Sequence, residues 1–381
     1  MLSKDPNTNS FSPEDKKWMR KALELAAKGA GYVSPNPLVG CVIVSENGKM
    51  IGKGYHERFG QAHAEINALK KVKDVSALRN ATMYVTLEPC AHHGKTPPCA
   101  EKIAGLPLKR VVVGMTDPNP KVSGKGIKII QDAGITTDVG LLEDEARTLN
   151  EAFIHYMRFG KPFVIMKMAQ TIDGYVAAPD GSSQWISGKE ARAKVHYWRS
   201  IYDAVMIGRN TAVNDNPRLT VRHVEGRQPW RIVVDGPLLL DKSLKLFTDQ
   251  YEEKTVIVTH NKEAYQSHGD PMLSLLNPDS FKGKTLLVGK KGGHTNLNEA
   301  ITEIGRLGIT SILVEPGSSL ATALIRENLV DKLYAFIAPK MLGGGTRSVI
   351  GAGINSINEA IELKNVTHEQ IGTDILITGY F

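Results

Sequence analysis

The sequence is poor in cysteine and has no long hydrophobic segment. Three cysteines in 381 residues are too few, and odd in number, for a disulfide scaffold. No run of roughly 18 apolar residues occurs, so no transmembrane helix is expected. The opening residues, MLSKDPNTNSFSPED, also lack the apolar core of a secretory signal. These absences predict a cytoplasmic protein that has no membrane partner.

Aromatic residues are scarce, and the positive charge is spread along the chain. Aromatics make up 6% of the residues, and the formal net charge is +7. No block of about five or more lysines and arginines stands out. Surfaces that bind nucleic acid usually combine clustered basic residues with aromatic side chains. We therefore expect a small anionic ligand, such as a phosphorylated substrate, and no nucleic acid.

Strand and helix patterns alternate through the whole chain, which predicts an α/β fold with largely parallel sheets. A chain of 381 residues is expected to form two domains. The residues Gly160-Lys161-Pro162 end a predicted helix just before a new strand. We place the boundary there, which gives domains 1–160 and 161–381.

In the first domain, Ser12 is expected to cap a helix that begins at Pro13 and runs to about Gly29. Asn47-Gly48 lies between two apolar runs and predicts a hairpin. The expected strands are Leu38–Ser45, Met50–Tyr55, Ala81–Leu87, Arg110–Met115 and Ile135–Val139. The further expected helices are His63–Val72, Pro97–Ala104, Gly124–Ala133 and Glu143–Phe159.

The second domain has the same character. Its expected strands are Phe163–Met168, Asp203–Ile207, Arg231–Asp235, Thr255–Thr259, Thr285–Val288, Ser311–Val314, Lys332–Ala338 and Asp374–Tyr380. Its expected helices are Lys189–Ser200, Asn296–Gly305 and Leu320–Glu327. The stretch Asp241–Gly293 is irregular and charged, and we assign no site to it.

One histidine and two cysteines in the first domain form a pattern typical of a catalytic zinc site. His63 opens an expected helix, Cys90 follows a strand, and Cys99 begins the next helix. Zinc favours four nitrogen and sulfur ligands, and a catalytic site keeps one position for a water that ionises at about pH 7. Glu65 is placed to move protons between that water and a leaving ammonia. Cys41 lies in an apolar strand and is expected in the core.

The spacing of the cysteines leaves other interpretations open. Zinc deaminases commonly have two residues between their cysteines, whereas the eight residues 91–98 separate Cys90 from Cys99. A structural zinc site closed by His92 or His93 is one alternative, but it gives Glu65 no role. A nucleic-acid base deaminase with an accessory C-terminal domain is another, and the lack of a basic, aromatic-rich stripe disfavours it.

A turn in the second domain is a candidate anion site. No GxGxxG follows a strand, so a Rossmann-type cofactor site is not supported. The segment Val314–Leu320 instead combines a strand end, a Gly/Ser turn and a helix start. Backbone N–H groups at a helix start attract phosphate, so Gly317, Ser318 and Ser319 could cradle the phosphates of a dinucleotide.

Several motifs together carry a family resemblance. PNPLVGCVIV, HAEINAL, TLEPCAHHGKTPPC and DPNP occur in this order. With the second half, they closely resemble the bifunctional deaminase/reductase family of riboflavin biosynthesis over nearly the whole chain. The resemblance implies a cytidine-deaminase-like α/β/α domain followed by a dihydrofolate-reductase-like α/β domain. It also implies zinc-dependent deamination of 2,5-diamino-6-(5-phosphoribosylamino)pyrimidin-4-one, then NADPH-dependent reduction of the ribosyl side chain to ribityl.

The resemblance also implies contacts for the deaminase substrate. Asn36 would hold the pyrimidine edge. His92 and Lys95, between the two cysteines, would reach the ribose or its phosphate. Asp117 and Asn119 of the DPNP motif would line the same pocket, although this motif is also ordinary turn chemistry.

For the reductase, the resemblance implies two further sets of residues. The nicotinamide cofactor would contact Ala169, Trp185, Thr211, Asp215, Gly236 and the turn Gly317, Ser318 and Ser319. The substrate would contact Lys167, Ser183, Arg199, Leu219, Arg222 and Glu315. Guanidinium groups match phosphate oxygens, so Arg199 and Arg222 are expected as phosphate clamps. A homodimer is expected because closed two-fold dimers are the commonest assembly.

Overall fold

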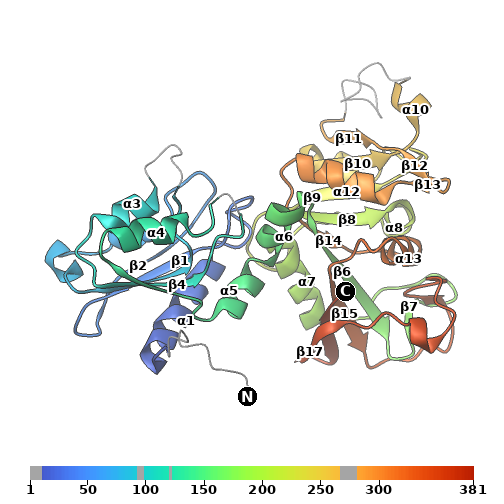
Figure 1. The fold of residues 1–381 in the computed structure, drawn as a ribbon. Coiled ribbons are helices and arrows are strands. Elements are labelled where there is room, and N and C mark those ends of the chain that lie inside the picture. The colour runs from blue at the N-terminus through green and yellow to red at the C-terminus, as the bar shows by residue number, and fades with distance from the viewer. Residues whose placement is uncertain (1–10, 92–97, 120–121, 267–280) are drawn as a thin grey trace. The chain divides into compact units, whose positions relative to one another are not determined.

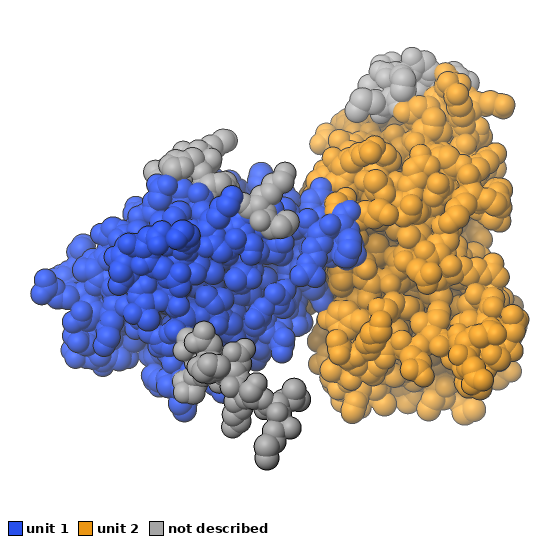
Figure 2. All heavy atoms as spheres, in the orientation of Figure 1, with its two compact units in different colours: residues 1–159 blue, residues 160–381 orange. Residues whose placement is uncertain are grey.

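The computed structural model describes residues 11–91, 98–119, 122–266 and 281–381. The chain divides into two compact units, Met1–Phe159 and Gly160–Phe381 (Figure 2). Each unit is built on its own β-sheet, as the ribbon in Figure 1 shows. Among the described residues, no helix combines the length and hydrophobicity that a membrane span requires.

The first unit has a five-stranded sheet in the order β2-β1-β3-β4-β5. Its strands are β1 (Gly40–Val44), β2 (Met50–Tyr55), β3 (Thr82–Leu87), β4 (Arg110–Met115) and β5 (Thr136–Val139). Its helices are α1 (Pro13–Ala27), α2 (Ala64–Leu69), α3 (Cys99–Ala104), α4 (Lys125–Asp132), α5 (Glu143–Leu149) and α6 (Glu151–Phe159), with the 3₁₀ turn η1 (Val75–Leu78). Strands β3, β4 and β5 are parallel, but β1 is antiparallel to both of its neighbours.

Alternate side chains of β1 explain the three layers of this unit. Cys41 and Ile43 pack with α2, α3 and α4, as expected for a cysteine in the core, whereas Val42 and Val44 pack with α1. Figure 1 shows α3 and α4 on one side of the sheet and α1 on the other. A capping box between Ser12 and Asp15 starts α1, as the sequence predicts.

The second unit has a nine-stranded sheet in the order β11-β10-β9-β8-β14-β6-β15-β18-β17. These strands are β6 (Phe163–Thr171), β8 (Ala204–Gly208), β9 (Trp230–Val234), β10 (Thr255–Thr259), β11 (Lys284–Leu287), β14 (Ser311–Val314), β15 (Lys332–Ala338), β17 (Lys364–Ile371) and β18 (Asp374–Tyr380). The run from β11 to β15 is parallel, while β18 and β17 add an antiparallel edge.

Helices cover both faces of this larger sheet. The described helices are α7 (Lys189–Ile201), α8 (Arg209–Asp215), α9 (Lys245–Thr248), α10 (Lys262–Gln266), α12 (Leu297–Arg306) and α13 (Ser318–Arg326), with the 3₁₀ turns η2 (Glu252–Lys254) and η3 (Ile357–Glu359). Helices α12 and α13 pack on one face, and α8 and α9 pack on the other. Short pairs join β12 (Lys290–Lys291) to β13 (His294–Thr295) and β16 (Thr346–Arg347) to β7 (Tyr175–Ala177).

The α/β prediction is confirmed for both units, but several details differ from it. The helix expected over 143–159 is interrupted at Asn150, whose buried side chain bonds instead to the backbone of Leu38. Helix α8 (Arg209–Asp215) is not among the helices expected above. Strand β17 was not expected because all but its last residue is exposed, which removes the alternating pattern of a strand.

Candidate functional site

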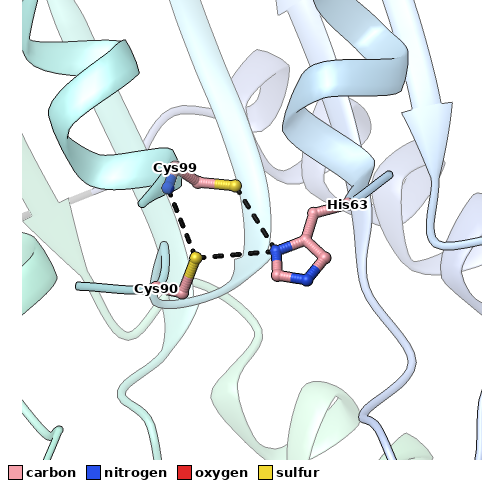
Figure 3. A group of neighbouring side chains, drawn as sticks. All are labelled: His63, Cys90 and Cys99. Atoms are coloured by element: carbon pink, nitrogen blue, oxygen red, sulfur yellow. Dashed lines mark hydrogen bonds between the residues drawn. The ribbon is translucent and has the colours of Figure 1, made fainter. Parts of the chain in front are cut away.

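His63, Cys90 and Cys99 come together in the first unit, as Figure 3 shows. His63 is the residue before α2, Cys90 follows β3 after a short connection, and Cys99 is the first residue of α3. The Nδ1 atom of His63 lies 3.5 Å from the sulfur of Cys90 and 3.4 Å from that of Cys99. The backbone N–H of Cys99 donates to the Cys90 sulfur at 3.3 Å.

These distances fit one tetrahedral metal ion. Zinc lies about 2.3 Å from sulfur and 2.0–2.1 Å from nitrogen, so two such ligands at a tetrahedral angle are roughly 3.5 Å apart. The ligand atoms of all three residues lie within 4.8 Å of one another. One imidazole and two thiols therefore form a donor set suited to zinc, with room for one further ligand.

Of the three side chains, Cys90 most readily takes the form that a metal requires. A hydrogen bond with the Cys99 thiol lowers the pKa of Cys90 to about 4, although burial opposes this. The same contact and burial raise the pKa of Cys99. Cys90 is therefore the first of the two to become a thiolate, which is the form that binds metal.

Glu65 lies beside this cluster, in the first turn of α2. Its side chain is 3% exposed, and burial raises its pKa to about 7. Within the described part of the chain, no group hydrogen-bonds to its Oε2, while the Cys99 thiol interacts with the carboxylate. Buried carboxylates are normally paired. An unpaired oxygen next to three ligand atoms indicates a site that a water or a substrate completes.

Asn36 is linked to the cluster through a histidine that the sequence gave no reason to select. The buried ring of His56 packs edge-on against His63, with ring centroids 5.4 Å apart. Its Nδ1 faces the carbonyl of Ala62 at 3.2 Å and so carries the proton. Its Nε2, 3.3 Å from the Asn36 amide nitrogen, must then accept a hydrogen bond. The Asn36 amide is thereby oriented, and no described residue occupies its oxygen, which is left for a ligand.

The DPNP loop is attached to the same site by a second unexpected residue, Glu88. This buried carboxylate precedes Pro89 and Cys90 and accepts hydrogen bonds from the backbone of Asp117, Gly124, Gly126 and Ile127. Asp117 in turn accepts from the backbone N–H of Asn119. Glu88 lies two residues before the metal-binding Cys90, but it serves to hold this loop.

Two of the expected deaminase contacts, His92 and Lys95, lie outside the described residues. Of the expected set, Asn36, Asp117 and Asn119 are therefore the ones the structure places, and each is joined to the metal-binding segments by the contacts of His56 or Glu88.

In the second unit, several expected cofactor residues lie at the carboxyl ends of four adjacent strands. Ala169 is near the end of β6, Thr211 follows β8, Gly236 follows β9 and Gly317 follows β14. A Cβ added to Gly317 would lie 3.2 Å from the Thr211 hydroxyl, so these two segments are in contact. The carboxyl edge of a parallel sheet is where such folds bind nucleotides.

The other expected cofactor residues are Trp185, Asp215, Ser318 and Ser319. Trp185 is 60% exposed, with the Arg192 guanidinium 4.5 Å from its ring centre. Asp215 ends α8, and burial raises its pKa. Ser318 begins α13 and donates from its hydroxyl to the carbonyl of Arg347, while Ser319 follows it.

Glu315, which follows β14, and Arg199, which lies in α7, form a bidentate ion pair. The Arg199 Nε and Nη2 atoms donate to the two carboxylate oxygens at 2.6 and 2.8 Å, and Nη1 donates to the carbonyl of Thr220. Although burial opposes it, the Arg199 charge lowers the pKa of Glu315 to about 2. Burial lowers the pKa of the nearby Lys167. Three expected substrate residues therefore share one charged cluster.

Arg222 is exposed beside this cluster. Its backbone N–H donates to Nδ1 of His196, a buried residue that the sequence analysis did not select. Burial, with the charge of Arg199, lowers the pKa of His196 to about 4, so this ring is neutral at pH 7. Leu219, by contrast, is buried in the hydrophobic core of the second unit, with a backbone φ of 53°. Ser183 lies half-buried in the loop after β7.

A surface pocket of about 700 Å³ adjoins Arg222, and its lining includes Arg218 and Lys245. Among the described residues, none of these three cations has an anionic partner. Burial, together with the charges of Arg199 and Arg218, lowers the pKa of Arg222. The pocket therefore has an excess of positive charge that suits an anionic group.

Two family profiles match separate parts of the chain. The cytidine and deoxycytidylate deaminase zinc-binding region matches residues 12–115, and the RibD C-terminal domain matches residues 162–377. The first match contains His63, Glu65, Cys90 and Cys99.

Relatives match over nearly the full length. The riboflavin biosynthesis protein RibD of Actinobacillus pleuropneumoniae is 40% identical, over 97% of this chain and 96% of that protein. RibD of Aquifex aeolicus is 41% identical, over 95% and 97%. The structure of a diaminohydroxyphosphoribosylaminopyrimidine deaminase/5-amino-6-(5-phosphoribosylamino)uracil reductase from Thermotoga maritima superposes with a TM-score of 0.84 and 34% identity, covering 96% of this chain and 98% of that one.

Proposed function

This chain belongs to the RibD family of bifunctional deaminase and reductase enzymes of riboflavin biosynthesis, and we propose the substrate and the residues that serve each activity. In our proposal, domain 1–160 deaminates 2,5-diamino-6-(5-phosphoribosylamino)pyrimidin-4-one. Domain 161–381 then reduces the ribosyl side chain of the product to ribityl with NADPH. The name of the Thermotoga maritima relative, which cites both pyrimidines, supports this assignment.

For the deaminase, His63, Cys90 and Cys99 would hold one zinc ion. That ion would supply a water whose pKa is lowered to about 7. Glu65 takes a proton from the attacking water and returns one to the amino group, which leaves as ammonia. Asn36 accepts a hydrogen bond from the pyrimidine edge, because His56 holds its amide nitrogen. Asp117 and Asn119, together with His92 and Lys95, complete the proposed pocket.

The observation that carries this proposal is the buried carboxylate of Glu65, with one unpaired oxygen beside the three ligand atoms. A structural zinc site gives no reason to bury such a group. A nucleic-acid base deaminase would use the same cluster, but the relatives that match the full chain are riboflavin-biosynthesis proteins. Cytoplasmic location, a homodimer and the lack of a nucleic-acid partner stay predictions.

The purified protein tests the proposal directly. We expect about one zinc per chain by atomic absorption, and ammonia release from the phosphorylated diaminopyrimidine that a chelator abolishes. With deamination blocked by the chelator, NADPH should be consumed with the deaminated product but not with the starting pyrimidine. A zinc-loaded protein that neither releases ammonia nor consumes NADPH would refute the proposal.

For the reductase, the carboxyl edge formed by β6, β8, β9 and β14 would bind NADPH. The residues involved are Ala169, Trp185, Thr211, Asp215, Gly236, Gly317, Ser318 and Ser319. NADPH supplies the hydride, and the protein orients the two carbons between which it moves. The contact between Thr211 and Gly317 supports this site, because a turn without a side chain lets a phosphate approach the backbone.

The reductase substrate would lie between the charged cluster and the cationic pocket. Lys167, Ser183, Leu219 and Glu315 would surround its ribose chain and ring. All three guanidinium nitrogens of Arg199 already donate hydrogen bonds, to Glu315 and to the carbonyl of Thr220, so we assign Arg199 to positioning Glu315. Arg222 is then the better candidate for the phosphate, with Arg218 and Lys245 close to it.

Replacing Arg222 tests the phosphate assignment. We expect Arg222→Ala to raise the reductase KM for the phosphorylated substrate by about 10- to 100-fold, because it removes charge-assisted hydrogen bonds. The KM for NADPH should change by less than about twofold. Arg306→Ala is the control, since Arg306 pairs with Glu303 on the surface of α12. Equal increases in both KM values for Arg222→Ala would show that Arg222 does not select the substrate phosphate.

A further inference from the structure

Two buried polar atoms that no described residue hydrogen-bonds lie at the carboxyl ends of β8 and β9. They are Nε of Arg209 and Oδ1 of Asp235, and they are 3.6 Å apart, beyond hydrogen-bonding distance. Arg209 comes directly after Gly208, which pairs with Val234 just before Asp235. Strands β8 and β9 are neighbours in the parallel part of the sheet, so their ends bring the two side chains together.

The two side chains differ sharply in exposure. Asp235 is 1% exposed, and its Oδ2 accepts hydrogen bonds from the backbone N–H groups of Leu239 and Leu240. Arg209 is 39% exposed although its Nε is buried. Its terminal nitrogens, Nη1 and Nη2, have no partner among the residues described here. Asp235 thus lies within ion-pair distance of the buried Nε of Arg209, and among the described residues the terminal nitrogens of this guanidinium remain free for an anion.

A histidine stands next to this pair. A Cβ added to Gly236 would lie 2.5 Å from Cε1 of His260, so the imidazole packs directly on the glycine backbone. Nδ1 of His260 lies 2.9 Å from the Thr295 hydroxyl. Burial and the charges of Lys290 and His294 lower the pKa of His260, so the ring is neutral at pH 7. Arg209 and Lys290 give this edge of the sheet a positive surplus.

This arrangement adjoins the proposed cofactor site. Gly236 and Thr211 are both expected cofactor contacts, and Arg209 precedes Thr211 by two residues in the same turn of α8. NADPH differs from NADH only in a phosphate on the 2′-oxygen of the adenosine ribose. In Rossmann-type sites, which this domain does not have, a nearby arginine accommodates that phosphate, whereas a carboxylate binds the ribose hydroxyl of NADH, and the same chemistry applies at other strand ends. Here the carboxylate is buried and the arginine is exposed.

We propose that Arg209, oriented by Asp235 and flanked by His260, binds the 2′-phosphate of NADPH and makes the reductase prefer NADPH to NADH. The proposal rests on the reductase function proposed above, and it adds a residue that determines cofactor choice. A planar guanidinium matches phosphate oxygens with two parallel hydrogen bonds, which an ammonium group does not reproduce.

Calorimetric titration of the full-length protein tests this without relying on turnover. The probes are adenosine 2′,5′-bisphosphate, AMP, NADPH and NADH, with wild type, Arg209→Ala, Arg209→Lys and the surface control Arg306→Ala. We expect Arg209→Ala to weaken binding of NADPH and the bisphosphate by about 10- to 100-fold. Binding of NADH and AMP should change by less than about threefold. Arg209→Lys should fall between wild type and Arg209→Ala, and Arg306→Ala should match wild type.

The outcomes separate this proposal from the one it rests on. If Arg209→Ala weakens NADPH and NADH equally, or neither, while the wild type binds NADPH, Arg209 does not read the 2′-phosphate and the reductase function stands. If the wild type prefers NADH, the proposal is wrong in the same way. If the wild type binds neither cofactor, the proposed reductase function fails and this inference fails with it. Circular dichroism of each variant checks that it is folded.

Discussion

Glu65→Gln is expected to lower the rate of deamination by about 10²- to 10⁴-fold while the protein keeps its full zinc content. A glutamine fills the same space but cannot take a proton from water, and a positioned proton-transfer group contributes roughly this factor to catalysis. Glu65 is not one of the three ligand residues, so its charge is not needed to hold the metal. Ammonia release and atomic absorption on the same preparation measure the two quantities.

Two controls make the result specific. Glu24→Gln changes an exposed glutamate on α1 that pairs with Lys21, and it should leave deamination unchanged. The reductase activity of Glu65→Gln should equal that of the wild type when the deaminated pyrimidine is supplied. Loss of zinc from Glu65→Gln would instead make the carboxylate part of the metal site. Deamination at the wild-type rate would support a structural zinc.

The metal-binding residues could be predicted from the sequence because their chemistry is unusual. Histidine and cysteine are rare enough that His63, Cys90 and Cys99, placed at the starts of two helices and the end of a strand, suggested one site before any contact was known. The geometry agrees with it, with sulfur–nitrogen distances of 3.4 and 3.5 Å. The long spacing between the cysteines, together with the motifs around it, identified the family.

The residues that orient these groups could not be predicted in the same way. His56 and Glu88 act through backbone atoms and through the packing of segments that are distant in sequence, and nothing in their immediate sequence marks that role. Asp235 is similar, because an aspartate at the end of a strand usually caps a turn, and this one does so with Leu239 and Leu240. Its second contact, with Arg209, depends on which strands are neighbours.

The strands and helices could be predicted where the burial of residues follows the local pattern of apolar residues in the sequence. Strands such as β4 and β14 are apolar along their length and were placed within a residue of their observed ends. The antiparallel attachment of β1 to β3 was not foreseen, since alternation of strands and helices favours parallel pairing. The break at Asn150 depends on hydrogen bonds to Leu38, which is 112 residues away. Long-range contacts of this kind override local helix propensity.

Glu315→Gln is expected to destabilise the second unit by about 3–5 kcal/mol at pH 7 and to abolish most of its reductase activity. The substitution leaves the guanidinium of Arg199 without its carboxylate, and breaking one side of a largely buried ion pair typically costs this much. The side chains of Arg199 and Glu315 are only 11% and 16% exposed, so water replaces little of the lost interaction. Deamination, which uses residues of the first unit, should continue at the wild-type rate.

The pH dependence gives this prediction a second, independent readout. The pKa of Glu315 is lowered to about 2 in the folded chain, and an unfolded glutamate titrates near 4.3. A lowered pKa stabilises the fold above the unfolded value, and this stabilisation disappears as the pH falls through the folded value. The difference in unfolding free energy between wild type and Glu315→Gln should therefore be constant above about pH 5 and shrink from there toward pH 2.

Denaturant unfolding across this pH range measures that difference, and a surface pair provides the control. Glu303→Gln breaks the exposed pair with Arg306 and should cost less than about 1 kcal/mol at any pH. Equal losses for the two variants at pH 7 would mean that the Arg199–Glu315 pair contributes no more than a surface contact. A difference that persists unchanged at pH 2 would mean that packing of the Glu315 side chain, and not its charge, stabilises this part of the sheet.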